Sequence, residues 1–164
     1  MATILELANT GKLEKYDPEL EYDEQEERYV YFLPSVLVRM LDELPTYVSN
    51  WKLEDSPQTQ FDQLMEVFCS GEPLTFDWMF KPLKHRQEGV WELKTPDLRL
   101  FGWFPVKDCF IVGAVDTAFN IKSYNLYEGH ANVVAHLRNQ LELNEPKFIS
   151  GKEPYDVVSN FDFP

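Results

Sequence analysis

The chain has 164 residues and a formal net charge of −13, with 44% hydrophobic and 15% aromatic residues. Such an acidic surface disfavours non-specific binding to nucleic acid or to an anionic membrane, because both require clustered Lys and Arg. The hydrophobic content suffices for one core in a domain of this length, which excludes a chain that is disordered throughout.

Two features of the sequence favour the cytoplasm. Cys69 and Cys109 each lie among apolar neighbours, without a CxxC pattern or Cys/His ligand spacing, so we expect buried thiols in a reducing compartment. The first residues carry charges and lack the apolar stretch of a secretory signal. No segment approaches the roughly 20 apolar residues of a membrane span, so no membrane partner is expected.

Residues 1–33 are predicted to form an extension ahead of the main domain. Residues 4–8 alternate loosely and precede the turn residues Asn9-Thr10-Gly11, which predicts a short strand or hairpin returning through residues 13–16. Glu14 to Arg28 then holds eight acidic residues against two basic ones. This run is interpreted either as a solvated linker or as an acidic arm, Glu14 to Glu27, that binds a basic protein.

Residues 34–146 are predicted to form the main domain, which follows a strand at 29–33. A first helix opens at Pro34 and stops at Pro45, with one apolar face formed by Leu37, Met40, Leu41 and Leu44. A second helix has Ser56 as its cap and Pro57 at its first position, and it ends at Gly71. Its buried stripe consists of Phe61, Leu64, Met65 and Phe68.

Three strands are predicted next, at residues 89–94, 98–104 and 109–118. Their short connections favour an antiparallel meander, because parallel strands need a crossover of a dozen or more residues. A last helix is predicted from Asn125, with Glu128 completing a capping box, to about Leu143. The tail, residues 147–164, is expected to pack on the domain.

These elements predict an α+β fold. The expected architecture is a small antiparallel sheet, built from the three-strand meander plus N-terminal strands and flanked by about three helices.

The order helix, helix, three strands, helix, together with the segment GVWELKTPDLRLFGWF at residues 89–104, resembles the RelE/HigB-like toxin superfamily, and in particular its phage-associated HigB-like branch. In that branch a strand reads Gly, apolar, Trp or Tyr, Glu, Leu, Arg or Lys, which is matched here by Gly89–Lys94. The next strand carries an Arg after an apolar residue, which is matched by Leu98-Arg99. The third strand and its exit, IVGAVDTAFNIKSY, also resemble the family, and the resemblance covers roughly residues 53–143.

The resemblance implies a toxin of a toxin–antitoxin or phage-derived system. Its implied activity is that of a ribosome-dependent mRNA endonuclease, or an inhibitor of translation, held silent by a cognate antitoxin. Matched residue by residue, Arg99, Lys94 and Lys122 are the expected catalytic residues, which bind phosphate and stabilise its developing charge. The chain departs from the family in being larger and strongly acidic. No cofactor is implied.

The densest positive cluster in the chain consists of Lys81, Lys84, His85 and Arg86. It is interpreted either as an RNA-binding spot that contacts phosphate or as an exposed loop. No His, Asp and Glu residues have metal-ligand spacing, and the chain has neither a phosphate-cradling Gly-rich loop nor a nucleophile elbow.

Several candidate residues have a structural interpretation beside the functional one. Arg99 and Lys94 can be solvent-facing strand residues that pair with Glu92 or Asp97. His130 can be a core or boundary histidine or a general base. The alternative to an enzyme is a non-enzymatic acidic module on the same fold, which binds a basic protein or mimics nucleic acid. Basic side chains on the sheet face would favour the enzyme, and acidic ones the module.

Overall fold

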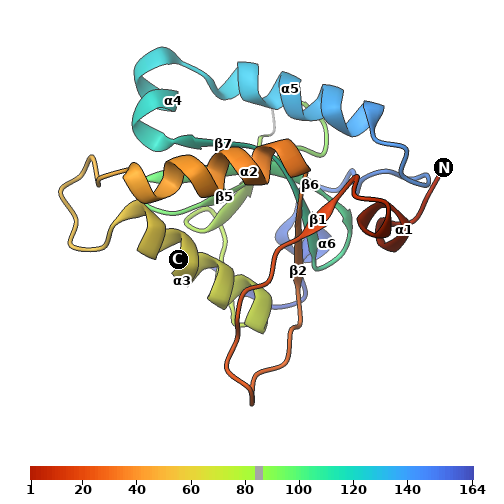
Figure 1. The fold of residues 1–164 in the computed structure, drawn as a ribbon, viewed down its shortest axis with the longest axis horizontal. Helices are drawn as coiled ribbons and strands as arrows, with labels where there is room; N and C mark the ends of the chain where they lie inside the picture. Colours follow the sequence, from red (N-terminus) through yellow and green to blue (C-terminus); the bar gives the residue numbers. More distant parts are fainter. Residues whose placement is uncertain (84–86) are drawn as a thin grey trace.

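Strands from both halves of the chain build one central sheet in the computed structural model, which describes residues 1–83 and 87–164. The sheet has six strands in the order β1-β2-β7-β6-β5-β4, and a second sheet pairs β3 with β8 (Figure 1). The strands are β1 (Glu14–Lys15), β2 (Tyr29–Phe32), β3 (Leu74–Thr75), β4 (Phe80–Pro82), β5 (Trp91–Lys94), β6 (Leu98–Val106), β7 (Cys109–Thr117) and β8 (Phe161–Asp162). The helices are α1 (Ile4–Asn9), α2 (Pro34–Glu43), α3 (Pro57–Ser70), α4 (Ala118–Tyr124), α5 (Tyr127–Gln140) and α6 (Pro154–Val157), and a 3-10 turn, η1 (Leu44–Thr46), follows α2.

The predicted α+β class and the meander β5-β6-β7 are confirmed, since each strand pairs antiparallel with the next. The prediction of an antiparallel sheet is wrong, because β2 pairs parallel with β7. The connection between those two strands contains α2, α3, the strand β3 of the second sheet and the strands β4, β5 and β6 of the central sheet. It is long enough to permit parallel pairing. The sheet is therefore mixed.

The first two predicted helices form as expected. The Ser56 hydroxyl accepts a hydrogen bond from the Thr59 N–H at 3.2 Å at the start of α3. Gly71 ends that helix with φ 83°, in the left-handed region that favours glycine. The apolar face of α2 is narrower than predicted, because Leu41 is 53% exposed.

The N-terminal strand predicted at residues 4–8 is wrong, because this segment forms α1. The Thr3 hydroxyl accepts from the Glu6 N–H at 3.1 Å, and the Glu6 carboxylate accepts from the Thr3 N–H at 3.3 Å. This capping box satisfies donors that a short helix would otherwise leave unpaired. Leu7 is then buried, so one apolar side chain fixes the helix to the body.

The start predicted for the last helix is also wrong. Asn125 does not open a helix; it ends α4 in the left-handed conformation, with φ 51°. The Thr117 hydroxyl caps α4 by accepting from the Asn120 N–H at 3.1 Å, and α5 begins two residues after Asn125. Asn is one of the few non-glycine residues that tolerates this conformation, so the same residue type suits either end of a helix.

Helices cover both faces of the central sheet and enclose two apolar clusters. The first cluster joins the sheet to α2 and α3, and it includes Val157 and Val158 of the C-terminal tail. The second joins the opposite face to α1, α4 and α5. No helix in the described part of the chain has both the length and the apolar character needed to cross a bilayer.

A buried cation at the end of the acidic run joins three distant segments. Arg28 is 1% exposed, and its guanidinium donates to the carbonyls of Phe68 at 2.8 Å, Glu72 at 2.9 Å and Asn160 at 2.6 Å. Its Nε lies 3.6 Å from Asp108 Oδ1. The carbonyls at the end of α3 have no N–H partner within the helix, and this arginine donates to them. No pattern in the sequence indicated this role.

Candidate functional site

Charged side chains share one face of the central sheet, the face toward α5. Lys94 on β5 lies opposite Arg99 on β6, which lies opposite Asp116 on β7. Glu92, two residues before Lys94, lies opposite Lys81 on β4. Residues opposite each other, and residues two apart on one strand, project to the same side. The five side chains therefore form one charged cluster, which we call the sheet-face cluster.

Arg99 is the most enclosed cation of the sheet-face cluster, with 6% of its surface exposed. Its Nη1 donates to the carbonyls of Thr95 at 2.5 Å and Leu98 at 2.9 Å. Its Nε is buried and has no hydrogen-bond partner among the described residues. The expectation that Arg99 faces solvent is therefore wrong, and its guanidinium retains unused donor capacity.

The two lysines of the cluster have different partners. Lys94 is half-buried, and its Nζ donates to the Asp77 carbonyl at 3.0 Å. Lys81 Nζ lies 3.8 Å from the Glu92 carboxylate, so Lys81 forms an ion pair with that buried acid. Burial, followed by the charges of Lys81 and Arg99, lowers the pKa of Lys94. An anion bound beside Lys94 would relieve this repulsion.

A buried polar network fixes the turn between β5 and β6. Gln60 of α3 accepts hydrogen bonds from the Thr95 hydroxyl at 3.0 Å and from the Asp97 N–H at 2.9 Å. Its amide nitrogen donates to Asp97 Oδ2 at 2.6 Å, while Asp97 Oδ1 accepts from the Asn50 N–H at 3.0 Å. Both carboxylate oxygens of Asp97 therefore accept hydrogen bonds that fix the turn against α3. No ion pair joins Asp97 to a described cation.

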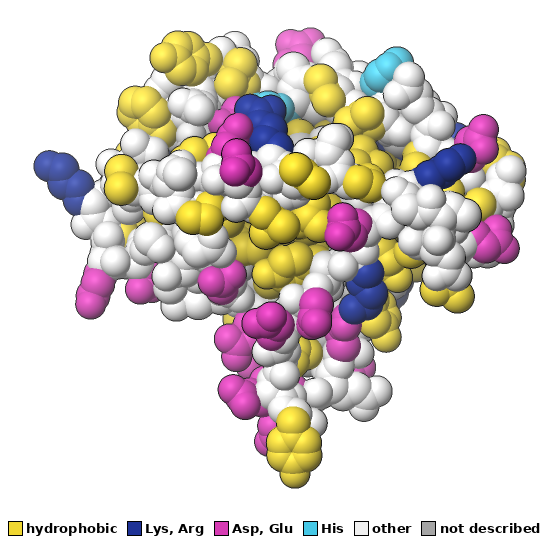
Figure 2. All heavy atoms as spheres, in the orientation of Figure 1, with side chains coloured by type: hydrophobic (Ala, Val, Ile, Leu, Met, Phe, Trp, Pro, Cys, Tyr) yellow, Lys and Arg dark blue, Asp and Glu magenta, His cyan; other side chains and the backbone are white. Residues whose placement is uncertain are grey.

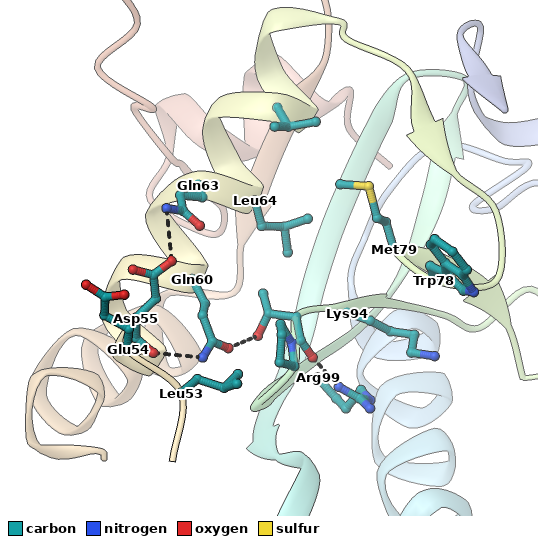
Figure 3. Close-up of a pocket in the computed structure, with 13 residues that line it drawn as sticks. Leu53, Glu54, Asp55, Gln60, Gln63, Leu64, Trp78, Met79, Lys94 and Arg99 are labelled. Carbon is teal, nitrogen blue, oxygen red and sulfur yellow. Dashed lines mark hydrogen bonds between the residues drawn. The ribbon is translucent and has the colours of Figure 1, made fainter. Parts of the chain in front are cut away.

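A pocket of about 730 Å³ opens beside this turn, with Lys94 and Arg99 in its lining. Figure 3 shows Gln60, Gln63 and Leu64 entering it from α3, with Trp78 and Met79 across from them. Trp78 is 67% exposed and so stands at the rim. The walls are mainly apolar and the two cations lie together, which suits a ligand with a flat apolar part and an anionic group.

Asp116, at the end of the charged row, is paired with a histidine of α5. The His130 Nε2 lies 2.8 Å from Asp116 Oδ2, and its ring stacks on Phe101 with centroids 5.1 Å apart. Burial alone would raise the pKa of the Asp116 carboxyl. Hydrogen bonds from His130, the Thr117 N–H and the Asn120 amide outweigh it and hold that pKa below its usual value. His130 is half-buried at the edge of the core, in line with the boundary position expected for it.

The structure brings some of the predicted site residues together and separates others. Arg99, Lys94 and Lys81 share one sheet face, as described above. Lys122 lies on α4, where its Nζ is 5.6 Å from the Trp51 ring centroid, and it does not line the pocket. Lys84, His85 and Arg86, also predicted to bind RNA, lie outside the described residues.

Sequence reasoning missed Gln60 and Trp78, which line the pocket. Gln60 lies within an amphipathic helix, where polar residues are usually exposed. Its position directly before Phe61, on the buried side of the helix, is the signal that could have revealed it. Trp78 was an exposed aromatic between two short strands, which a single sequence does not distinguish from a core residue.

The two thiols are buried and free, as predicted, and they offer no nucleophile. Burial raises the pKa of both Cys69 and Cys109 to about 12. No group of His, Cys, Asp and Glu within residues 1–83 and 87–164 has the arrangement to hold a metal ion.

Comparisons with known proteins give no assignment for this fold or site. No family model, curated protein or solved structure matches the chain.

Proposed function

We propose that this chain is a toxin-like protein of a toxin–antitoxin or phage-derived system, which acts on RNA during translation as a ribosome-dependent mRNA endonuclease or as a translation inhibitor. The main observation in support of the proposal is that Lys94 and Arg99 lie opposite each other on β5 and β6 and both line the pocket beside the β5–β6 turn. The order of two helices, a three-strand meander and later helices supports it, because this is the order on which the resemblance rests. The site of action is the cytoplasm, and the implied partners are mRNA on the ribosome and a cognate antitoxin.

The proposed chemistry is electrostatic. Arg99 and Lys94 bind the phosphate of one nucleotide, and the guanidinium stabilises the negative charge that develops when the phosphodiester is attacked. Lys122 is left out of this phosphate site because Trp51 lies beside its ammonium group.

The acidic surface limits how RNA can be held. With a net charge of −13, the chain repels RNA over most of its surface, so contact is confined to the neighbourhood of Lys81, Lys94 and Arg99. The number of phosphates neutralised is then small, and the affinity for RNA should fall only gently with salt. The ribosome or a partner has to supply the rest of the binding energy.

A paired set of variants tests this proposal in bacteria and in purified translation. The double variant Lys94→Met and Arg99→Met removes both charges and keeps apolar volume. The matched control, Lys107→Met and Lys152→Met, removes two exposed lysines away from the pocket. Induction of the parent and the control should arrest growth and protein synthesis, whereas the double variant should do neither.

Two results would contradict it. One is a parent chain that is soluble yet inhibits neither growth nor purified translation from several bacteria. The other is a double variant that inhibits as strongly as the parent, since the inhibition would then not pass through the phosphate site.

A second function, an acidic module that binds a basic protein or mimics nucleic acid, is favoured by one observation. Figure 2 shows acidic side chains gathered on the projecting loop between β1 and β2, at the bottom of the view. Four acidic residues of this loop are exposed: Glu19, Glu21, Asp23 and Glu27. Exposed like charges for which the described residues supply no ion-pair partner are available to a basic surface.

Neutralising the loop tests the second function. Glu19, Glu21, Asp23 and Glu27 are replaced by their amides, and the control replaces the exposed acids Asp62, Glu66, Glu128 and Glu142 in the same way. Titration with a lysine-rich peptide should show weaker binding for the loop variant than for the control. Equal affinities would mean that only net charge matters, which contradicts a dedicated acidic arm.

A further inference from the structure

One strand of the central sheet has an edge that is only partly covered. The parallel partner β2 pairs with residues 109–112 of β7, and the last bond on that side runs from the Leu33 N–H to the Val112 carbonyl at 3.2 Å. Beyond it, no described backbone group outside β6 bonds to residues 113–116. The second half of β7 therefore has an open edge, which is a template for another strand.

The direction of the backbone groups follows from one hydrogen bond. The Ala118 N–H donates to the Asp97 carbonyl at 2.8 Å, in the register that pairs Leu100 with Val115. Bonded and non-bonded pairs alternate along an antiparallel ladder, so Val115 belongs to a non-bonded pair and turns its N–H and carbonyl away from β6. The Thr117 N–H also points outward, and Asp116 Oδ1 accepts it at 2.8 Å.

Two helices turn this open edge into a groove. A pocket of about 470 Å³ lies along β7, with α2 on one side and α5 on the other (Figure 1). Both helices contact β7 directly. Apolar side chains form most of its lining: Val36 and Met40 from α2, Val115 from the strand, and Val133 and Leu137 from α5. Val133 is 50% exposed, so part of this apolar surface lacks cover.

One end of the groove carries charge. The Glu43 carboxylate accepts hydrogen bonds from Arg39 at 3.1 Å and from the Tyr47 hydroxyl at 2.9 Å. These hydrogen bonds, first from Tyr47 and then from Arg39, hold the pKa of the Glu43 carboxyl below its usual value. A cation placed beside the Glu43 carboxylate would be attracted by it and by the net charge of −13 on the chain.

We propose that this groove binds an extended, basic segment of a partner protein, which adds to the central sheet as a strand beside residues 113–116 of β7. The Val115 backbone supplies a donor and an acceptor to the new strand. Alternate side chains of the segment pack on the apolar walls of α2 and α5, and a Lys or Arg reaches Glu43. The proposal is independent of the phosphate site, because the pocket beside the β5–β6 turn shares no lining residue with the groove.

Random peptides of about eight residues, displayed on phage and selected on the full-length chain, serve as the probe. The selected sequences should alternate apolar residues and carry at least one Lys or Arg. A synthetic peptide of the selected sequence should slow hydrogen exchange at the Val115 amide, and N-methylation of its backbone on the pairing side should abolish binding.

Two pairs of variants localise that binding. Val115→Pro removes the outward N–H but leaves the bonds to β6, whereas Val115→Thr keeps the N–H. Glu43→Arg reverses a charge in the groove, whereas Asp42→Arg reverses an exposed charge that does not line it. The first member of each pair should weaken peptide binding by about tenfold or more, and the second by less than about twofold. The Glu43 pair decides the question if the proline variant fails to fold.

Three outcomes would overturn the proposal. Selection could yield no peptides that bind in solution. The selected peptides could bind the Val115→Pro and Glu43→Arg variants as tightly as the parent. The chain could itself be a dimer in sedimentation that Val115→Pro dissociates, in which case the edge is occupied by a second copy.

Discussion

The two faces of the central sheet carry different chemistry although the same strands build both. Toward α2 and α3, Leu93, Leu100 and Phe104 are buried in a continuous apolar cluster. Toward α5, the same strands place Lys94 and Arg99 among charged neighbours. Side chains alternate between faces with a period of two, so one strand can stabilise the fold on one side and hold charges on the other. The comparison predicts that the apolar residues of the first face contribute more to stability than Lys94 and Arg99 do, although an apolar cluster also lies on the second face.

The largest effect is expected on the apolar face. Phe104→Ala should lower the free energy of unfolding by about 3–5 kcal/mol, because it leaves a cavity in a core where little can collapse. Phe104 is 1% exposed and its ring lies 4.9 Å from that of Phe110. Urea unfolding measures the loss. Val106→Ala, at a residue of the same strand that is 53% exposed, is the control and should cost less than about 0.5 kcal/mol.

A smaller loss of stability is expected at the sheet-face cluster. Arg99→Met should cost about 1–3 kcal/mol, because the carbonyls of Thr95 and Leu98 lose a donor while the apolar volume is kept. Urea unfolding measures this loss too, with the exposed Arg39→Met as the control. A loss as large as that of Phe104→Ala would show that Arg99 is chiefly structural. It would contradict the expectation that the charged residues contribute less to stability than the apolar face.

The contribution of Asp116 should depend on pH. Asp116→Asn is expected to lower the free energy of unfolding by about 1–2 kcal/mol near pH 7, because the charged acceptor of His130 is lost. The pKa of this carboxyl is lower in the folded state than in the unfolded state. Its stabilisation is therefore fully present well above pH about 4 and is lost as the pH falls below that value.

Urea midpoints of the parent and of Asp116→Asn, measured from pH 7 down to pH 3, test this dependence. The difference between the two proteins should shrink below pH about 4. A difference that grows on acidification would mean that the sign is wrong and that Asp116 is not stabilised as a carboxylate.

The two thiols, one on each side of the sheet, should differ in reactivity between the folded and the unfolded chain. Cys69, on α3, belongs to the apolar cluster on one side of the sheet. Cys109 lies two residues before Ile111 on β7, so alternation along the strand places it on the opposite side. With both pKa values raised to about 12, the native chain should hardly react with a disulfide reagent at pH 8. In urea, both thiols should react roughly a thousandfold faster, because the thiolate fraction recovers. Fast labelling of one thiol in the native state would show that its side of the sheet opens.

Local patterns in the sequence determined the parts of this protein that depend on near neighbours. The apolar period and the Ser56 cap sufficed to place α3, and alternating apolar residues with short turns sufficed for the β5-β6-β7 meander. Arg99 and Lys94 could be recognised as neighbours because the turn between their strands is short. These features depend on contacts within a few residues along the chain, which one sequence displays directly.

Only the tertiary structure decided which long-range contacts form and which side chains they enclose. Three features depend on segments far apart in sequence. They are the parallel pairing of β2 with β7, the burial of Arg28 among distant carbonyls, and the groove that α2 and α5 form beside the open edge at Val115. Asn125 ended α4 instead of opening a helix, because asparagine can cap the start of a helix and also tolerates the left-handed conformation at its end. In each case the sequence allowed several partners, and packing of the whole chain selected one.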